Sequence, residues 1–166
     1  MIRPAQADDA AQIAAIYNHY VLNTTITFET QAVSAIEIAG RIDGVAAAEL
    51  PWLVAEEDGR LLGYAYATPW RSRAAYRRSV EVTVYLDQQA RGRGLGTALY
   101  GALFAVLQQG GIHAAIGGIA LPNDASVRLH EKLGMKQVAH FKEVGRKFGR
   151  WIDVGYWQRL LTAPTE

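Results

Sequence analysis

The stretch Gln89-Ala90-Arg91-Gly92-Arg93-Gly94-Leu95-Gly96 decides the fold because it joins a strand-like segment to a helix-like one. Residues 79–86, which precede it, alternate apolar and polar side chains as a half-buried strand does. The glycines allow the backbone to approach a ligand closely, and the helix that follows leaves its first amide groups unpaired. Such a helix N-terminus attracts phosphate, and the two arginines add positive charge. The sequence therefore predicts that a pyrophosphate binds at this turn.

Two other glycine-rich phosphate sites fit this turn less well. It lacks the Gly-Lys-Ser/Thr ending of a P-loop, which argues against transfer of an ATP γ-phosphate. Its Gly-x-Gly-x-Gly spacing and its position after a hairpin also differ from a Rossmann dinucleotide site, which normally opens its domain. Taken by itself, the pattern also fits a plain strand-to-helix turn with incidental glycines.

The rest of the chain mixes strand and helix patterns, which indicates one α/β domain over residues 1–166. Asp8 or Asp9 is expected to cap a first helix, and Ser34 and Glu37 have the spacing of a capping box that starts a second. Asp58-Gly59 predicts a tight hairpin turn. Strands are expected at residues 2–4, 52–56, 61–68, 79–86, 114–120, 136–144 and 151–160, and later helices at residues 94–108 and 125–133.

Composition and charge narrow the functional class. The chain has 166 residues, and 17 Lys and Arg residues against 16 Asp and Glu residues give a net charge of +1. This balance gives no reason to expect a nucleic-acid or membrane partner. No stretch approaches the ~20 apolar residues of a membrane helix, and no signal peptide is recognisable. The absence of cysteine excludes disulfides and cysteine metal sites, so we expect a cytoplasmic protein without a metal.

Several motifs resemble the GNAT superfamily of N-acetyltransferases, and the resemblance covers nearly the whole chain. Gln89-x-x-Gly92-x-Gly94 matches the Gln/Arg-x-x-Gly-x-Gly/Ala signature, whose loop holds the pyrophosphate of acetyl-CoA. Residues 123–135 resemble a later helix of these proteins, which an asparagine starts. The chain is most similar to the phosphinothricin and methionine sulfoximine N-acetyltransferase subgroup, through the segments Ile16-Tyr17-Asn18-His19-Tyr20, Thr27-Phe28-Glu29, Trp70-Arg71-Ser72-Arg73 and Val144-Gly145-x-Lys147-Phe148-Gly149-Arg150-Trp151-x-Asp153.

This resemblance implies a single-domain acyl-CoA N-acyltransferase fold, in which helices flank a central, twisted, mostly antiparallel sheet. It implies acetyl-CoA as cosubstrate, with its pantetheine arm paired to the backbone like an added strand. Asn123 would hold that arm by its amide, although it fits a plain helix cap equally well. The residues that would contact acetyl-CoA are Val84, Tyr85, Leu86, Arg91, Gly92, Arg93, Gly94, Leu95, Gly96 and Asn123.

Acetyl transfer needs an amine that has lost a proton and a thioester carbonyl that is polarised. Glu81, on the strand before the glycine-rich turn, is the expected base, acting directly or through a water. His130 is the candidate acid for the leaving sulfur, since histidine titrates near neutrality. It stands where many superfamily members carry a tyrosine, and departure of the thiolate without a dedicated acid is the alternative.

The acceptor is expected to carry an acidic group. Arg71 and Arg73, with Tyr76 close behind, suit a carboxylate or phosphinate, because a guanidinium group binds such anions through two hydrogen bonds. A solvated basic loop is the alternative for these arginines. By resemblance, Phe28 and Glu29 line the same pocket as the expected base.

The leading hypothesis is direct transfer, in a ternary complex, to an amino-acid-like acceptor such as phosphinothricin, methionine sulfoximine or methionine sulfone. The related enzymes imply a homodimer. One alternative keeps the fold and acetylates a protein α-amine, a polyamine or an aminoglycoside, and the arginine-rich segment argues against such cationic acceptors. The other is a non-catalytic acetyl-CoA-binding sensor, against which Glu81 and His130 argue.

Overall fold

The structure is a computed structural model that describes residues 1–161; the last five residues of the domain expected over 1–166 lie outside the described residues. Short 3-10 turns at Ala7–Asp9, Ala74–Tyr76 and Gln88–Ala90 connect the regular elements. These elements are β1 (Ile2–Pro4), α1 (Ala10–Asn23), α2 (Ala35–Ala47), β2 (Trp52–Glu57), β3 (Arg60–Pro69), β4 (Ser79–Leu86), α3 (Leu95–Gln109), β5 (Ala114–Ala120), α4 (Asp124–Lys132), β6 (Lys136–Lys147) and β7 (Arg150–Leu160).

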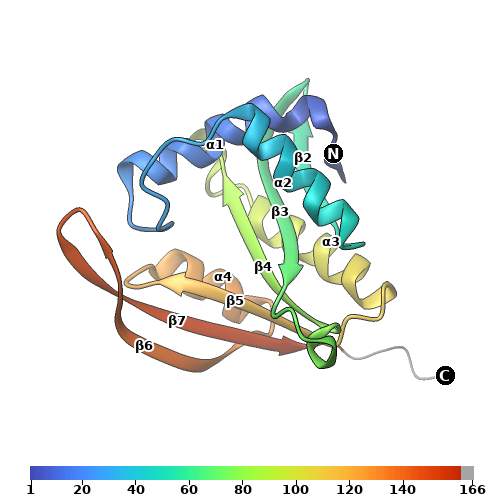
Figure 1. Cartoon of the computed structure of the whole chain (residues 1–166). Coiled ribbons are helices and arrows are strands. Elements are labelled where there is room, and N and C mark those ends of the chain that lie inside the picture. The colour runs from blue at the N-terminus through green and yellow to red at the C-terminus, as the bar shows by residue number, and fades with distance from the viewer. Residues whose placement is uncertain (162–166) are drawn as a thin grey trace.

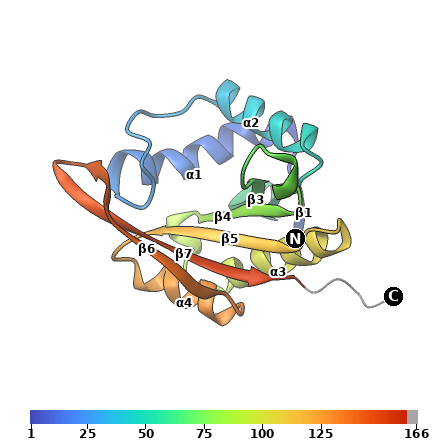
Figure 2. The same cartoon turned by 60° about the horizontal axis from the view of Figure 1, so that its bottom comes forward.

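Seven strands form one sheet in the order β1-β2-β3-β4-β5-β7-β6 (Figure 1). Neighbouring strands are antiparallel except for β4 and β5, which are parallel. The helices lie on both sides of this sheet, with α1 and α2 on one face and α3 and α4 on the other (Figure 2). The expected fold class, a mostly antiparallel sheet flanked by helices in a mixed α/β domain, is confirmed.

Each face of the sheet has its own hydrophobic core. On one face, Ile13 of α1 and Ile38 of α2 pack against Val54 and Tyr64. On the other face, Leu99 and Leu103 of α3 pack against Val80 and Val82 of β4. The alternation in β4 therefore directs its valines toward α3, and this leaves Glu81 and Tyr85 on the side of α1.

The parallel pair β4–β5 is short, and this gap in the sheet creates the site. Only Ser79, Val80 and Glu81 are paired with β5, opposite Ala114, Ala115 and Ile116. Beyond Glu81, β4 keeps its ladder with β3 but has no partner strand on its β5 side among residues 1–161. Figure 1 shows the two strands diverging toward the end of β4. The C-terminal half of β4 therefore presents a free backbone edge inside the molecule.

Local sequence signals account for several of these elements. The Ser34 hydroxyl accepts a hydrogen bond from the Glu37 amide at 3.1 Å, so the predicted capping box of α2 is confirmed. Asp58 and Gly59 both have positive φ angles, 50° and 79°, as the predicted tight turn between β2 and β3 requires. Asp9 is the N-cap residue of α1, one of the two predicted, but its side chain makes no capping hydrogen bond to that helix: its carboxylate accepts from the Gln6 amide at 2.7 Å and organises the preceding turn.

The last hairpin differs from its sequence-based prediction. The glycine at position 145 suggested a turn over residues 145–149, but β6 continues to Lys147, and Gly145 pairs with Ile152. The turn itself is Phe148-Gly149, with φ angles of 52° and 72°. The register shifts between Phe141 and Gly145, so a bulge accommodates the extra residues. This longer strand carries Gly145 and Lys147 up to the loop that follows α1.

Candidate active site

Two adjoining pockets occupy the gap between β4 and β5. The first, named here the Glu81 pocket, has a volume of about 250 Å³ and contains Glu81, Tyr100, Gly118 and His130. The second, the glycine-turn pocket, has a volume of about 340 Å³ and contains the glycine-rich turn. Both are lined by Ile26, Val84, Tyr85, Asn123 and Ser126. A ligand that fills one pocket therefore reaches the other along the free edge of β4.

The glycine-turn pocket places a helix N-terminus at its end. Gly92 and Gly94 have φ angles of 76° and 75°, in the left-handed region where glycine avoids the steric cost of a side chain. Gly94 is the residue before α3, and no side chain caps this helix start. The pocket is lined by Arg91, Gly92, Gly94, Leu95 and Gly96 from the predicted loop. Free amides and the helix dipole therefore face the pocket from this turn.

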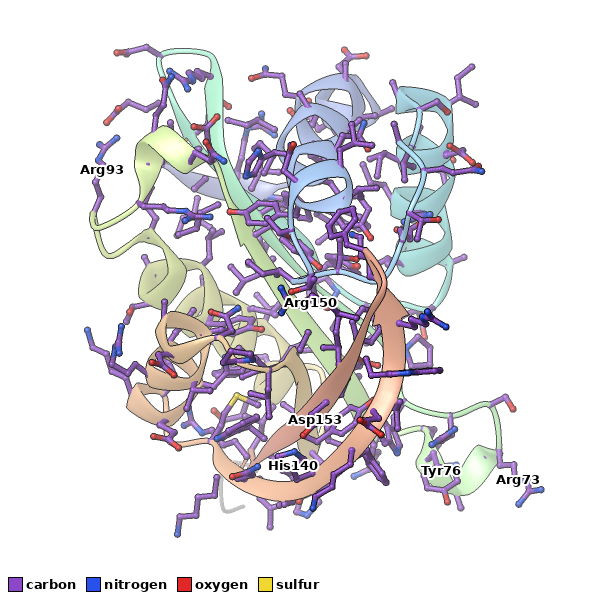
Figure 3. All side chains as sticks on the ribbon, turned by 90° about the vertical axis from the view of Figure 1, so that its left-hand side faces the viewer. Arg73, Tyr76, Arg93, His140, Arg150 and Asp153 are labelled. Carbon is purple, nitrogen blue, oxygen red and sulfur yellow. The ribbon has the colours of Figure 1, made fainter. Side chains whose placement is uncertain are left out.

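The two arginines of the turn point in different directions. The Arg91 side chain lines the pocket and donates to the Tyr20 hydroxyl at 3.3 Å. Arg93 is instead paired with Glu57, at 2.8 Å between Nη2 and Oε1, and extends away from the molecule (Figure 3). The prediction that Arg93 lines the pocket is therefore not supported for its side chain.

The edge of β4 and the start of α4 form the pocket walls between these two ends. Val84, Tyr85 and Leu86, whose contact with the cosubstrate arm stays a prediction, line the glycine-turn pocket, and the Tyr20 hydroxyl donates to the Leu86 carbonyl. Asn123 caps α4, since its Oδ1 accepts from the Ser126 amide at 3.2 Å. Within residues 1–161 its amide nitrogen has no protein partner, so the cap leaves a donor available to a ligand.

Glu81 lies at the last paired position of β4, opposite Ile116, where the sheet opens. Burial raises the pKa of its carboxyl, and the nearby Arg71 charge partly opposes that shift. Within the described part of the chain, this carboxylate accepts no hydrogen bond. A Cβ atom placed on Gly118 would lie 3.5 Å from Oε1 of Glu81, so that glycine keeps space beside the carboxylate. Glu81 is thus a half-buried carboxylate that remains free to accept a proton.

His130 is buried in the wall of the Glu81 pocket, with 3% of its surface exposed. Its Nδ1 lies 2.7 Å from the Ser126 carbonyl oxygen, so Nδ1 carries the proton and donates it. Its Nε2, 3.1 Å from the Tyr100 hydroxyl, is then the acceptor. Burial lowers the pKa of the imidazole, which favours this neutral form. In this arrangement Nε2 has no proton to give to a leaving group.

The loop after α1 contributes only one of its two expected residues, Phe28 and Glu29, to the Glu81 pocket. Phe28 lines the Glu81 pocket beside Ile26 and Thr27. Glu29 does not line it, because Arg41 binds its carboxylate at 2.5 and 2.9 Å and Tyr17 donates to it. These partners lower the pKa of Glu29 and keep it ionised on the far side of the loop. Its predicted contact with the acceptor is therefore not supported in this chain.

In the arginine-rich segment after β3, the predicted acceptor-binding residues also differ in how close they come to Glu81. The Arg71 guanidinium lies over the Trp70 ring at 5.0 Å. It is close enough to Glu81 for its charge to oppose the rise in the pKa of that carboxyl. Arg73 and Tyr76 lie on the protruding loop between β3 and β4 (Figure 3). None of the three predicted residues lines the Glu81 pocket, and Arg71 and Arg73 line a separate pocket. Of this predicted group, the structure brings only Arg71 toward Glu81.

Several pocket residues were missed by sequence reasoning. Thr83 and Tyr85 share the face of Glu81, so the period of the strand could have identified Thr83. Tyr156 and Gly118 come from β7 and β5, which the sequence alone does not place next to β4. Tyr100 belongs to the buried face of α3, where an aromatic residue is normally read as core.

Among residues 1–161, no cluster of three or more metal-ligating side chains is found. No helix in this range is long and apolar enough to span a membrane.

Comparisons with known proteins agree with this geometry. The family model for the acetyltransferase (GNAT) domain matches residues 2–155. A phosphinothricin N-acetyltransferase of Streptomyces viridochromogenes is 41% identical over 163 residues, which cover 98% of this chain and 88% of that protein. An L-methionine sulfoximine/L-methionine sulfone acetyltransferase of Salmonella typhimurium is 38% identical over 160 residues, or 96% of this chain and 94% of that protein.

A solved structure shows the same fold. The phosphinothricin acetyltransferase of Sinorhizobium meliloti, determined in complex with acetyl-CoA, superposes with a TM-score of 0.94 at 37% identity. The match covers 100% of this chain and 93% of that one. The predicted family resemblance is confirmed, and the chain belongs to the GNAT acetyltransferase family.

Proposed function

We propose that this protein transfers the acetyl group of acetyl-CoA directly to the amino group of a small amino-acid-like acceptor. The acceptor class is that of phosphinothricin, methionine sulfoximine and methionine sulfone, which the relatives named above acetylate. One observation carries the proposal: a free carboxylate at Glu81 and a helix start at Gly94 that no side chain caps face two adjoining pockets along β4. A donor bound at the turn and an amine bound beside Glu81 would meet where the sheet opens.

The residues of the glycine-turn pocket suit acetyl-CoA, which supplies an activated acetyl thioester. The amides at the start of α3 and the Arg91 guanidinium would bind its pyrophosphate. The free edge of β4 at Val84–Leu86 and the Asn123 amide would bind the extended arm by hydrogen bonds. The Leu86 carbonyl is already hydrogen-bonded to Tyr20, so the available backbone groups lie closer to Glu81.

Glu81 is proposed as the general base. The α-amino group of a free amino acid is largely an ammonium ion at neutral pH, so one proton must leave before nitrogen attacks. A carboxyl whose pKa is raised by burial accepts that proton more readily than an exposed one. Arg71 is proposed to attract the acidic group of the acceptor, since its charge already reaches Glu81. Contacts of Arg73 and Tyr76 with the acceptor stay predictions.

His130 enters this proposal as a neutral structural partner of Tyr100. Its Nε2 accepts from Tyr100 and its pKa is lowered, so protonation of the leaving thiolate by His130 is not part of the mechanism. The thiolate of coenzyme A is a stable enough leaving group to depart into solvent-accessible space without an acid. The acid role of His130 stays an untested prediction.

The experiment is an acetyl-transfer assay with a panel of amines. The protein is incubated with acetyl-CoA and either phosphinothricin, methionine sulfoximine, methionine sulfone, a polyamine, a peptide α-amine or an aminoglycoside, and release of free thiol is followed. Turnover with the first three supports the proposal. Turnover only with the polyamine, peptide or aminoglycoside overturns the acceptor class. Tight acetyl-CoA binding without any turnover favours the sensor alternative.

A cytoplasmic homodimer is also proposed. The cysteine-free composition matches a protein that needs no oxidising compartment. The β6–β7 hairpin, at the edge of the sheet, exposes large apolar side chains at Val138, Phe141, Val144, Phe148 and Trp151. A monomer rarely leaves a group of this kind in water. Light scattering should give twice the monomer mass, and Trp151→Ser should shift it toward the monomer; a monomeric wild type would overturn the proposal.

A further inference from the structure

One buried cation has no part in the proposed chemistry. Lys147, near the tip of the β6–β7 hairpin, exposes only 3% of its surface, although lysine is almost never fully buried without a partner. Its Nζ donates to the Thr27 carbonyl oxygen at 2.8 Å, across 120 residues of sequence. Burial lowers the pKa of the ammonium group, while the nearby Glu29 charge raises it. A lysine held in this place requires an explanation beyond solubility.

The partner of Lys147 is a residue of the pocket wall. Thr27 and Phe28 both line the Glu81 pocket, whereas Lys147 does not. The Thr27 hydroxyl is also 2.8 Å from the Tyr17 hydroxyl of α1. Thr27 therefore connects α1 and the hairpin at the wall of the Glu81 pocket.

A second contact joins the same two segments. A Cβ atom placed on Gly145 would lie 2.3 Å from the Phe28 ring, so this ring packs directly on the backbone of β6. Gly145 and Lys147 point to the same side of the strand, two residues apart, and hold Phe28 and Thr27 respectively. Figure 3 shows the tip of the hairpin reaching the loop after α1.

We infer that Lys147 is a positioning residue for the acceptor: with Gly145 it fixes the Thr27–Phe28 wall of the Glu81 pocket. This inference rests on the proposed function in so far as the pocket binds the acceptor. The loop is also held at Thr27 by the Tyr17 hydroxyl, and away from the pocket by Asn18 with Val33 and Glu29 with Arg41. Loss of the Lys147 contact therefore releases the Thr27 carbonyl and its backbone at the pocket wall, while the Thr27 hydroxyl and the ends of the loop stay in place.

The test compares Lys147→Met with Lys142→Met in the full-length protein. Both remove a lysine from β6, but Lys142 is exposed, so it serves as the matched control. A hydrogen bond from a charged donor is stronger than one between neutral groups, so its loss in Lys147→Met should raise the KM for the acceptor about tenfold. The KM for acetyl-CoA should stay within about twofold. Lys142→Met should change neither.

Hydrogen exchange separates this inference from the proposed function. Amides in residues 24–34 should exchange faster in Lys147→Met than in wild type, measured without any acceptor. Unchanged exchange in this loop overturns the inference whatever the enzyme acetylates. If wild type acetylates no amine in the panel, the proposed function fails, and faster exchange still supports the fixed wall.

A purely structural role for Lys147 gives a different result. It predicts a lower melting temperature with both KM values unchanged, and that outcome would also overturn the inference. Should Lys147→Met not fold, Gly145→Ala takes its place, because the added Cβ displaces the Phe28 ring without removing a charge. A rise in the acceptor KM alone is again expected, and equal KM values in Gly145→Ala and wild type would contradict it.

Discussion

The two pockets are built in opposite ways. The glycine-turn pocket draws its anion-binding groups from consecutive residues and mostly from the backbone, at the start of α3. The Glu81 pocket is built from side chains of β4, the loop after α1, α3, β5, α4 and β7, which are distant in sequence. The first construction suits a constant ligand, because amides change little when side chains vary. The second allows the acceptor to change by single substitutions far apart in the chain.

The substitution expected to separate the roles of the two pockets most clearly is Glu81→Gln. The substitution preserves shape and removes the proton acceptor, so kcat should fall about 10²–10⁴-fold, the usual contribution of a general base. Acetyl-CoA affinity, measured by calorimetry, should stay within about twofold because the binding groups lie in the other pocket. A fall in affinity as large as the fall in rate would contradict this separation.

Gly94→Ala acts on the other pocket. No atom lies within 4 Å of the added Cβ, so the cost comes from the φ angle of 75°, ~1–2 kcal/mol for a residue other than glycine. If the start of α3 shifts to relieve it, the KM for acetyl-CoA should rise about five- to thirtyfold, with the acceptor KM unchanged. Gly101→Ala is the control, since it lies within the same helix and is equally unobstructed. Equal acetyl-CoA KM values in the two variants would exclude a role for the strained turn.

The pH dependence tests the electrostatics of the Glu81 pocket. Glu81 must be ionised to act as a base, so kcat/KM should fall as pH drops through its raised pKa. Arg71 favours the ionised form of Glu81, so Arg71→Met should raise that pKa. The acid limb of the pH profile, the range in which kcat/KM falls as pH drops, should then move to higher pH. Arg73→Met, which alters a side chain that does not line the Glu81 pocket, should leave the limb in place. A limb that does not move in Arg71→Met would exclude an electrostatic influence of Arg71 on the base.

His130→Gln should have the smallest effect. Glutamine can still bond Tyr100 and the Ser126 carbonyl in part, and a neutral His130 donates no proton from Nε2. A loss of kcat below about tenfold is therefore expected, below the usual contribution of a positioned acid. A loss as large as that of Glu81→Gln, together with a changed basic limb of the pH profile, would restore the acid role.

Much of the fold was accessible from local signals. The Asp58-Gly59 turn, the Ser34 capping box and the glycine-rich turn each depend on the conformation of adjacent residues, which sequence reports directly. The end of β6 was predicted wrongly because Gly145 looks like a turn residue. In the structure it stays in the strand, where the absence of a side chain admits the Phe28 ring.

The candidate site was predictable only in part, because sequence reports interactions between adjacent residues and not those between distant ones. Glu81 and the turn follow from the order of elements along the chain. The direction of Arg93 depends on Glu57, and that of Glu29 on Arg41, pairs separated by 36 and 12 residues. The tautomer of His130 depends on the Ser126 carbonyl, one turn earlier in α4, and on Tyr100, which only the packing of α4 against α3 brings to it. Apart from the contact between His130 and Ser126, no local pattern contains these partnerships.

The unpaired edge of β4 has a thermodynamic consequence. A ligand that binds along this edge supplies the hydrogen bonds that β5 does not, so part of the energy that orders this region comes from the ligand. By mass action, free acetyl-CoA at a hundred times its Kd would add ~2.7 kcal/mol to the free energy of unfolding. The resistance of the protein to heat and proteolysis would then follow the acetyl-CoA concentration around it, and depletion of that pool would shorten its lifetime as well as slow its turnover.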